Sequence, residues 1–298
     1  MSMPQLRPVL VGGHESRQGA DLERLLAVLP GALVTAPGRA LHDRVRALLE
    51  SGAGPIAVLP MTWGRDPVAV ADTARTLHWL STGTGTDAAR GRLALCEPFG
   101  TIDHLVALLR MAATRTVAAQ PDAALVIAAP RADPFDDAEL HRVAHLVRTH
   151  GAGLEVAVAC VDTDADLAHA VGRERLLGAD GVVVVPAGFA ESSPAPAALD
   201  GASFYGPLLS DRAMARIVEE RVATAVHELD HGRDGIDEGL EADHGHGYAH
   251  SHESVPGSGA HPHTHGHQHQ HQHHDVAAAL APVAPGPTRA DAPAPAHL

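Results

Sequence analysis

The segment PVLVGGHESRQG, residues 8–19, decides the fold class of this chain. A short apolar run of strand-forming residues ends in two glycines, and a polar stretch follows before the next helical pattern begins. The same succession recurs along the chain, where short runs rich in Val, Ile and Leu alternate with amphipathic stretches of helical period. Strands that alternate with helices predict βαβ units and a parallel sheet. We therefore expect an α/β fold.

The alternation divides the chain into two similar series of elements. In the first series we expect strands at residues 8–13, 32–36, 55–61 and 92–97, and helices at 20–30, 39–52, 66–80 and 101–115. In the second we expect strands at residues 124–130, 154–161 and 181–188, and helices at 136–151, 165–178 and 211–229. LESGAGPIAVLPM in the first series matches LLGADGVVVVPAG in the second in its turn Gly, its apolar run and its Pro. We expect two tandem Rossmann-like halves, residues 5–120 and 121–230, with a cleft between them.

Composition excludes several classes of function. Hydrophobic residues make up 45% of the chain and aromatic residues 3%, so the core must consist of Ala, Val and Leu. A net charge of −14 argues against a nucleic-acid-binding surface. The chain has no Lys, which excludes Schiff-base chemistry and Walker-type phosphate loops. Two cysteines cannot form a disulfide scaffold or a Cys-based zinc site. No apolar run reaches the length of a membrane span or signal peptide, so we expect a cytoplasmic protein that does not contact a membrane.

Residues 231–298 form a His-rich and then Ala/Pro-rich tail, which we expect to be disordered because it has almost no apolar surface to bury. Its repeated His-x-His spacing lets neighbouring imidazoles chelate one divalent ion with little selectivity. The candidate metal ligands in this tail are His244, His246, His250, His252, His261, His263, His265, His267, His269, His271, His273 and His274. Whether such a tail stores or delivers metal, or is only a solvated segment, stays open.

Polar residues follow several of the predicted strands, where the ligands of parallel sheets bind. The first strand is followed by His14, Glu15, Ser16 and Arg17, and the third by Arg65 and Asp66. An imidazole with neighbouring carboxylates suits metal binding or proton transfer, and scattered Arg side chains suit a ligand rich in carboxylates. The alternative interpretation of His14 is a structural one, in which it is a turn histidine that caps the next helix.

GGHESRQG after a first strand resembles the GHGSR-type signature of the class II tetrapyrrole chelatases, the family of sirohydrochlorin cobaltochelatases and ferrochelatases. The tandem halves, PFG at residues 98–100 and GPLLSDRAMARIVEERV at residues 206–222 are similar to that family too, so the resemblance covers most of residues 8–225. It implies a chelatase-like fold. It also implies an enzyme of cobalamin or sirohaem synthesis that inserts Co²⁺ or Fe²⁺ into sirohydrochlorin without ATP, with His14 as metal ligand and proton acceptor.

The sequence departs from the family pattern at three positions of the expected site. Thr35, Ala36 and Pro37 follow the second strand, where members of the family often carry a Glu. Val68 occupies the position of a second active His when the chain is aligned on Asp72, and Glu15 replaces the Gly between His and Ser. Glu15 and Asp66 are therefore candidate catalytic partners of His14, with His78 as a further substitute. The candidate contacts for substrate carboxylates are Ser16, Arg17, Arg39, Arg65 and Arg131.

We expect a divalent metal as substrate, Co²⁺ before Ni²⁺ or Fe²⁺, no organic cofactor, and a monomer or homodimer. The main rival to a chelatase is a non-catalytic cobalt or nickel chaperone or store on the same fold. A tetrapyrrole-binding protein without a metal role is a third hypothesis.

Two other His patterns lie on predicted helices. HELDH, residues 227–231, matches the HExxH pattern of zinc peptidases, but it ends an amphipathic helix and Asp234 stands where the extended motif requires Gly. A weak accessory metal site fits this segment better than a peptidase. His141 and His145 are also one turn apart, and we expect them at the solvated edge of their helix.

Overall fold

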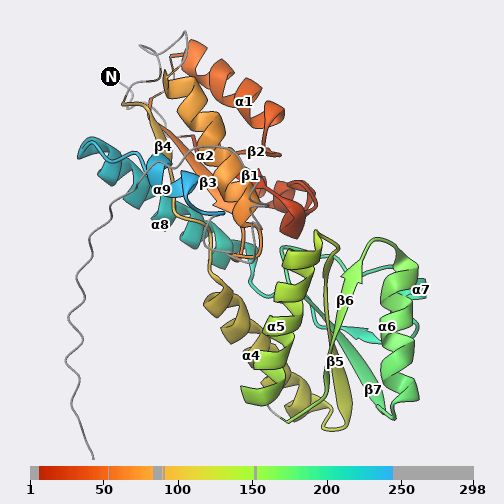
Figure 1. Cartoon of the computed structure of the whole chain (residues 1–298). Helices are drawn as coiled ribbons and strands as arrows, with labels where there is room; N and C mark the ends of the chain where they lie inside the picture. Colours follow the sequence, from red (N-terminus) through yellow and green to blue (C-terminus); the bar gives the residue numbers. More distant parts are fainter. Residues whose placement is uncertain (1–6, 53, 83–88, 90, 151–152, 244–298) are drawn as a thin grey trace, which may run out of the picture. The chain divides into compact units, whose positions relative to one another are not determined.

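Parallel strands form two separate sheets in the computed structural model, which describes residues 7–52, 54–82, 89, 91–150 and 153–243 (Figure 1). Sheet A contains β1 (Val9–Gly12), β2 (Leu33–Thr35), β3 (Ile56–Met61) and β4 (Leu93–Leu95), in the order β2-β1-β3-β4. Sheet B contains β5 (Ala123–Pro130), β6 (Val156–Val161), β7 (Gly181–Pro186) and β8 (Ser203–Phe204), in the order β6-β5-β7-β8. The shared order confirms the expected α/β fold with two tandem parallel-sheet halves.

Continuous apolar runs form the central strands because helices cover both faces of each sheet. Every residue of β3 is buried, and Leu10 of β1 is paired with Val34 and Leu59 on its two sides. One face of sheet A packs against α1 (Arg39–Glu50) and α2 (Pro67–Thr82). One face of sheet B packs against α6 (Asp164–Leu176) and the short α7 (Pro196–Leu199).

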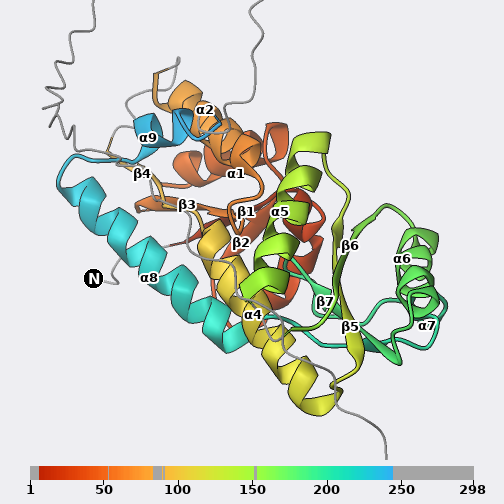
Figure 2. The ribbon, with the colours of Figure 1, turned by 60° about the horizontal axis from the view of Figure 1, so that its bottom comes forward.

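Two further long helices connect the two halves. α8 (Asp211–Asp230) follows sheet B in the chain but packs against β3 and β4 of sheet A (Figure 2). α4 (Ile102–Ala119) follows sheet A but packs against β5 and β7 of sheet B and against α5 (Pro134–His150). As a result, one hydrophobic cluster runs through both halves.

Residues 20–27 form a 3₁₀ helix, η2 (Ala20–Ala27), rather than the α-helix that their apolar pattern predicts. The chain reaches η2 through Arg17, Gln18 and Gly19, which all have positive φ, and the shorter η1 (His14–Ser16) precedes this turn. After this turn the first backbone hydrogen bond of η2 spans three residues, as in a 3₁₀ helix, because the Leu22 amide donates to the Gly19 carbonyl.

The folded part extends past residue 230, where the sequence analysis placed the start of a disordered tail. α9 (Ile236–Leu240) packs against α2, with Ile236 buried, and the Leu95 amide of β4 donates to the Asp234 carbonyl at 2.7 Å. Two apolar residues in an otherwise polar stretch give no periodic signal, which is why the sequence did not predict this helix. The tail histidines, residues 244–274, lie outside the described residues. None of the described helices combines the length and the hydropathy that crossing a membrane requires.

Candidate metal centre

The loop after β1 brings His14 to the carboxyl end of sheet A, beside the residue that precedes α2. The backbone N–H of His14 donates to Asp66 Oδ2 at 2.9 Å. Gly13 permits this approach, because a Cβ there would collide with the Asp66 carboxylate. The second oxygen of Asp66 accepts from the Ala69 amide at 3.0 Å and so caps α2. Hydrogen bonds from backbone N–H groups therefore hold both residues in place, independently of any contact between their side chains.

Three side chains from both halves converge here. His14 Nδ1 lies 3.0 Å from Asp66 Oδ2 and 3.6 Å from Asp136 Oδ2, and Asp136 belongs to the first turn of α5. One ligand atom from each of the three lies within 4.8 Å of the others, which within the described ranges is the one such group of three. Both carboxylates sit at helix N-termini, where the helix dipole favours negative charge.

These donors fit a divalent metal ion. The His14 nitrogen that faces both carboxylates is Nδ1, so Nδ1 is the atom that an ion shared by the three residues would bind. One imidazole with two carboxylates suits Fe²⁺, Co²⁺, Mn²⁺ or Zn²⁺ better than Cu⁺ or an iron–sulfur cluster, which prefer sulfur ligands.

His14 and Asp66 form a mutually stabilised ion pair. Burial lowers the pKa of His14, but the hydrogen bond and charge of Asp66 outweigh it and hold the pKa above the ordinary 6.5. Burial raises the pKa of Asp66, but the hydrogen bond and charge of His14 outweigh it and hold the pKa below the ordinary 3.8. Without metal, the imidazole is therefore positioned as a proton carrier beside an ionised carboxylate.

Asp136 titrates differently from Asp66. Burial raises the pKa of Asp136 to about 7, and the nearby charges of Asp133 and Asp66 act in the same direction against His14 and Arg65. Since Asp66 already neutralises the imidazolium, a second negative charge is disfavoured until a cation arrives. Asp136 therefore exchanges a proton near neutral pH.

Glu15 lies beneath the centre rather than in it. Its side chain is buried and accepts hydrogen bonds from the Thr62 hydroxyl and from the amides of Trp63 and Arg65. Burial raises the pKa of Glu15, opposed by the charge of Arg65 and the Thr62 hydrogen bond. Glu15 therefore holds the turn after β3 in place.

Arg65 is fully buried, although the sequence suggested it as a contact for substrate carboxylates. Its guanidinium donates to the carbonyls of Ala187 at 3.4 Å and Asp136 at 3.3 Å, both in the second half. It has no exposed surface for a substrate carboxylate. Arg65 therefore connects the two halves and holds the backbone of one metal-site residue.

The other expected substrate contacts are spread over several environments. Ser16 is buried, donates to the Gly13 carbonyl and accepts from the Gly19 amide, so it shapes the loop. Arg17 is exposed and pairs with Asp21, whereas Arg39 is 94% exposed and lies 3.7 Å from Asp43. Arg131 is half-exposed and pairs with Asp162 at 2.6 Å. The exposed guanidiniums keep donors that a ligand can reach.

A solvent-open pocket of about 250 Å³ leads to the three ligands. Val68, in the position of the second family histidine, lines it and supplies no ligand atom, while His78 is an exposed residue later in α2. Sequence reasoning missed Asp136. Its signal was present, because an acidic first turn follows the strand of the second half that corresponds to β1.

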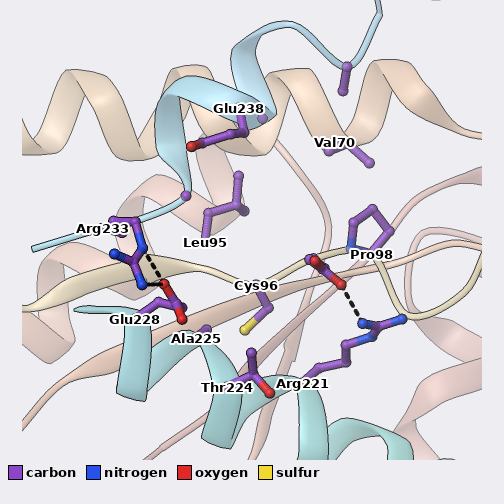
Figure 3. Close-up of a pocket in the computed structure, with 14 residues that line it drawn as sticks. Val70, Leu95, Cys96, Pro98, Arg221, Thr224, Ala225, Glu228, Arg233 and Glu238 are labelled. Carbon is purple, nitrogen blue, oxygen red and sulfur yellow. Dashed lines mark hydrogen bonds and ion pairs between the residues drawn. The ribbon is translucent and has the colours of Figure 1, made fainter. Parts of the chain in front are cut away.

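A larger pocket of about 450 Å³ lies between β4, α8 and α9 (Figure 3). Ion pairs between Arg221 and Glu97 and between Arg233 and Glu228 border it. Burial raises the pKa of the Cys96 thiol in this pocket to about 12, which keeps it un-ionised and unreactive. Among the described residues, the lining of the larger pocket holds no group of three potential metal ligands like the one at His14.

The chain is similar in structure to sirohydrochlorin chelatase SirB from Bacillus subtilis subspecies spizizenii in complex with cobalt, with 16% identity and a TM-score of 0.43, covering 77% of this chain and 99% of that chain. SirB from Bacillus subtilis with Fe³⁺ gives 15% identity, the same TM-score of 0.43 and the same coverage of 77% and 99%. The ABC domain in complex with L-Trp from Streptococcus pneumonia gives 10% identity and a TM-score of 0.36, covering 78% of this chain and 87% of that chain. No family model matches the sequence, and no curated protein gives a significant match. At these TM-scores we infer the chemistry of the site from its own residues.

Proposed function

We propose that this chain is a metal chelatase that inserts a divalent ion, Co²⁺ in the first place, into sirohydrochlorin. The observation that carries the proposal is the convergence of His14 Nδ1 with Asp66 and Asp136, where His14 belongs to a loop whose sequence resembles the chelatase signature. The metal and the tetrapyrrole are substrates, so the site must hold the ion only until the ring takes it.

The three ligands suit such a temporary site. Insertion exchanges one M²⁺ for the two pyrrole N–H protons of the macrocycle, so two protons must leave as the ion enters. When the ion departs, the ligand atoms of His14 and Asp136 are released and can bind protons, because Asp66 raises the pKa of His14 above its ordinary value and burial raises the pKa of Asp136 to about 7. Metal release and proton uptake are therefore coupled in the same side chains, while Asp66 stays ionised and orients the imidazole.

The surroundings of the pocket suit a flat ring with acidic substituents. Val68 lines the pocket at 45% exposure, and Phe135, which precedes Asp136, is 69% exposed. Exposed large apolar side chains beside a polar site are typical of a ligand-binding surface. We assign the peripheral carboxylates of the substrate to the exposed guanidiniums of Arg17 and Arg131, which would exchange Asp partners for the ligand.

Anaerobic absorption spectroscopy of sirohydrochlorin with Co²⁺ tests the proposal. We expect the full-length chain to accelerate insertion above the rate without protein. His14→Ala and Asp136→Asn should each lower that rate by about 10²–10⁴-fold, as loss of a proton-transfer group does. Asp103→Asn is the matched control, because Asp103 is an exposed carboxylate in the first turn of α4 that does not line this pocket, and the variant should leave the rate unchanged.

The test also separates the rival functions. A cobalt or nickel chaperone would bind metal at His14 without accelerating insertion. A tetrapyrrole-binding protein would bind the metal-free ring and likewise leave the insertion rate at its value without protein. No acceleration of insertion by the chain, or an unchanged insertion rate in His14→Ala, would contradict the chelatase proposal.

A further inference from the structure

We propose that His227 and His231 form a second metal-binding site, for late first-row divalent ions such as Cu²⁺ and Ni²⁺, at the C-terminal end of α8. The centroids of the two rings lie 4.6 Å apart, with the ring planes at 82°. Residues at i and i+4 of a helix share one face, so one nitrogen of each ring can bind the same ion.

The helix geometry persists through the second ligand. α8 ends at Asp230, and His231 is its C-cap with φ −96° and ψ 8°, while its amide donates to the Glu228 carbonyl at 2.9 Å. The last turn therefore keeps His231 in register with His227. The unpaired carbonyls of a helix C-terminus carry partial negative charge, which favours a bound cation.

Both imidazoles are available to a ligand. Both residues are exposed, and within the part of the chain that the structure describes no hydrogen bond or ion pair to either ring is found. Glu228 interacts electrostatically with both rings and forms an ion pair with Arg233 at the edge of the larger pocket (Figure 3). Its charge adds to the attraction for a cation, and water completes the coordination.

The donor set differs from that at His14. Two imidazoles without carboxylate ligands follow the general affinity order, with Cu²⁺ above Ni²⁺ and Co²⁺, whereas the His14 centre is rich in oxygen. The HELDH pattern therefore describes a two-histidine chelate and not a peptidase centre. Among the described residues this helix face has no third histidine, and the Asp234 carboxylate accepts a hydrogen bond from the Ile236 amide at 3.0 Å.

The chain provides a matched control on another helix. His141 and His145 have the same spacing on α5 and are also exposed. Their rings do not touch, and His227 with His231 is the one pair of histidine rings in contact within the described ranges. The proposal therefore predicts metal protection for one pair and not for the other.

Site-resolved chemical labelling tests this on the full-length chain without interference from the tail. Diethyl pyrocarbonate acylates neutral imidazole nitrogens that are not bound to metal. Trypsin cleaves after Arg221 and Arg233 and releases a peptide with these two histidines alone, while His141 and His145 fall in separate peptides. At a Ni²⁺ concentration ten times Kd, labelling of His227 and His231 should slow by about tenfold. Labelling of His141 and His145 should be unchanged.

A variant shows whether the two rings bind one ion. In His231→Gln, the Ni²⁺ protection of His227 should be lost, whereas His145→Gln should leave it intact. Circular dichroism confirms that these surface variants are folded. Equal labelling of His227 with and without Ni²⁺, or full protection of His227 in His231→Gln, would overturn the proposal. Both outcomes are independent of whether the chain inserts metal into sirohydrochlorin.

Discussion

Asp136 and His14 together shape how the candidate metal centre responds to pH, because the pKa of each is raised and each must lose its proton to bind an ion. The ordinary pKa of an Asp carboxyl is 3.8, and burial together with neighbouring carboxylates raises that of Asp136 to about 7. Below pH 7 a metal ion must therefore displace a proton from Asp136, and above pH 7 it does not. The affinity of the His14 centre for a divalent ion should accordingly rise from pH 6 to pH 8.

Carbon-13 NMR of the Asp side-chain carboxyl groups measures this directly at one residue. With the signal assigned through Asp136→Asn, we expect a titration midpoint of about 7 in the metal-free chain. Saturating Zn²⁺ should keep the same carboxylate ionised well below that pH, because the bound cation favours the charged form. A metal-free midpoint near 4, the usual value for an exposed Asp, would contradict the raised pKa.

At the scale of single residues, the sequence predicted where the site residues lie in the fold better than it predicted how buried each side chain is. His14 and Asp66 follow predicted strands, and the rule that ligands meet at the carboxyl ends of parallel strands places them together. Burial of Arg65 depends on two carbonyl groups that are contributed by the other half of the chain. No local pattern encodes such a contact, so the side chain looked like an exposed guanidinium.

At the scale of elements, the loop after β7 supports the loop after β1. The Phe189 amide donates to the Glu15 carbonyl at 3.2 Å, and a Cβ on Gly188 would lie 2.5 Å from that same oxygen. The backbone of one half thus packs directly against the segment that carries His14. Glycine is required at position 188 because of this close approach.

Gly188→Ala should therefore disturb the centre without touching a ligand. We expect its free energy of unfolding to fall by about 1–3 kcal/mol, as for overpacking, together with weaker metal binding at His14. Gly172→Ala in α6 is the control, since no atom lies within 4 Å of its added Cβ, and it should gain up to about 1 kcal/mol in helix propensity. Urea unfolding measures both variants, and equal stability of the two would contradict the packing argument.

Long, periodic elements were predictable from sequence and short ones were not. The apolar pattern located α1, α2, α4, α5, α6 and α8 because each places a repeated apolar stripe on a sheet. α9 buries Ile236 through tertiary contacts with α2, and η2 takes its 3₁₀ geometry from the turn before it. The apolar pattern of the sequence reveals neither the existence of α9 nor the 3₁₀ geometry of η2, because both depend on contacts or turns outside the element.

At the scale of the whole molecule, each half supplies part of the centre and part of the other half's core. His14 and Asp66 come from sheet A and Asp136 from the helix after β5, while α4 and α8 each pack on the sheet of the other half. The repeated strand order could be predicted from the matching segments. The exchange of helices could not, because both packing choices bury the same apolar stripe.

Anomalous diffraction at the cobalt edge, from crystals of the full-length chain grown with Co²⁺, shows which side chains hold the ion. We expect a cobalt peak bonded to His14, Asp66 and Asp136, and its disappearance in Asp136→Ala crystals. Cobalt bound elsewhere, with His14 Nδ1 still hydrogen-bonded to Asp66 and no peak among the three side chains, would contradict this expectation.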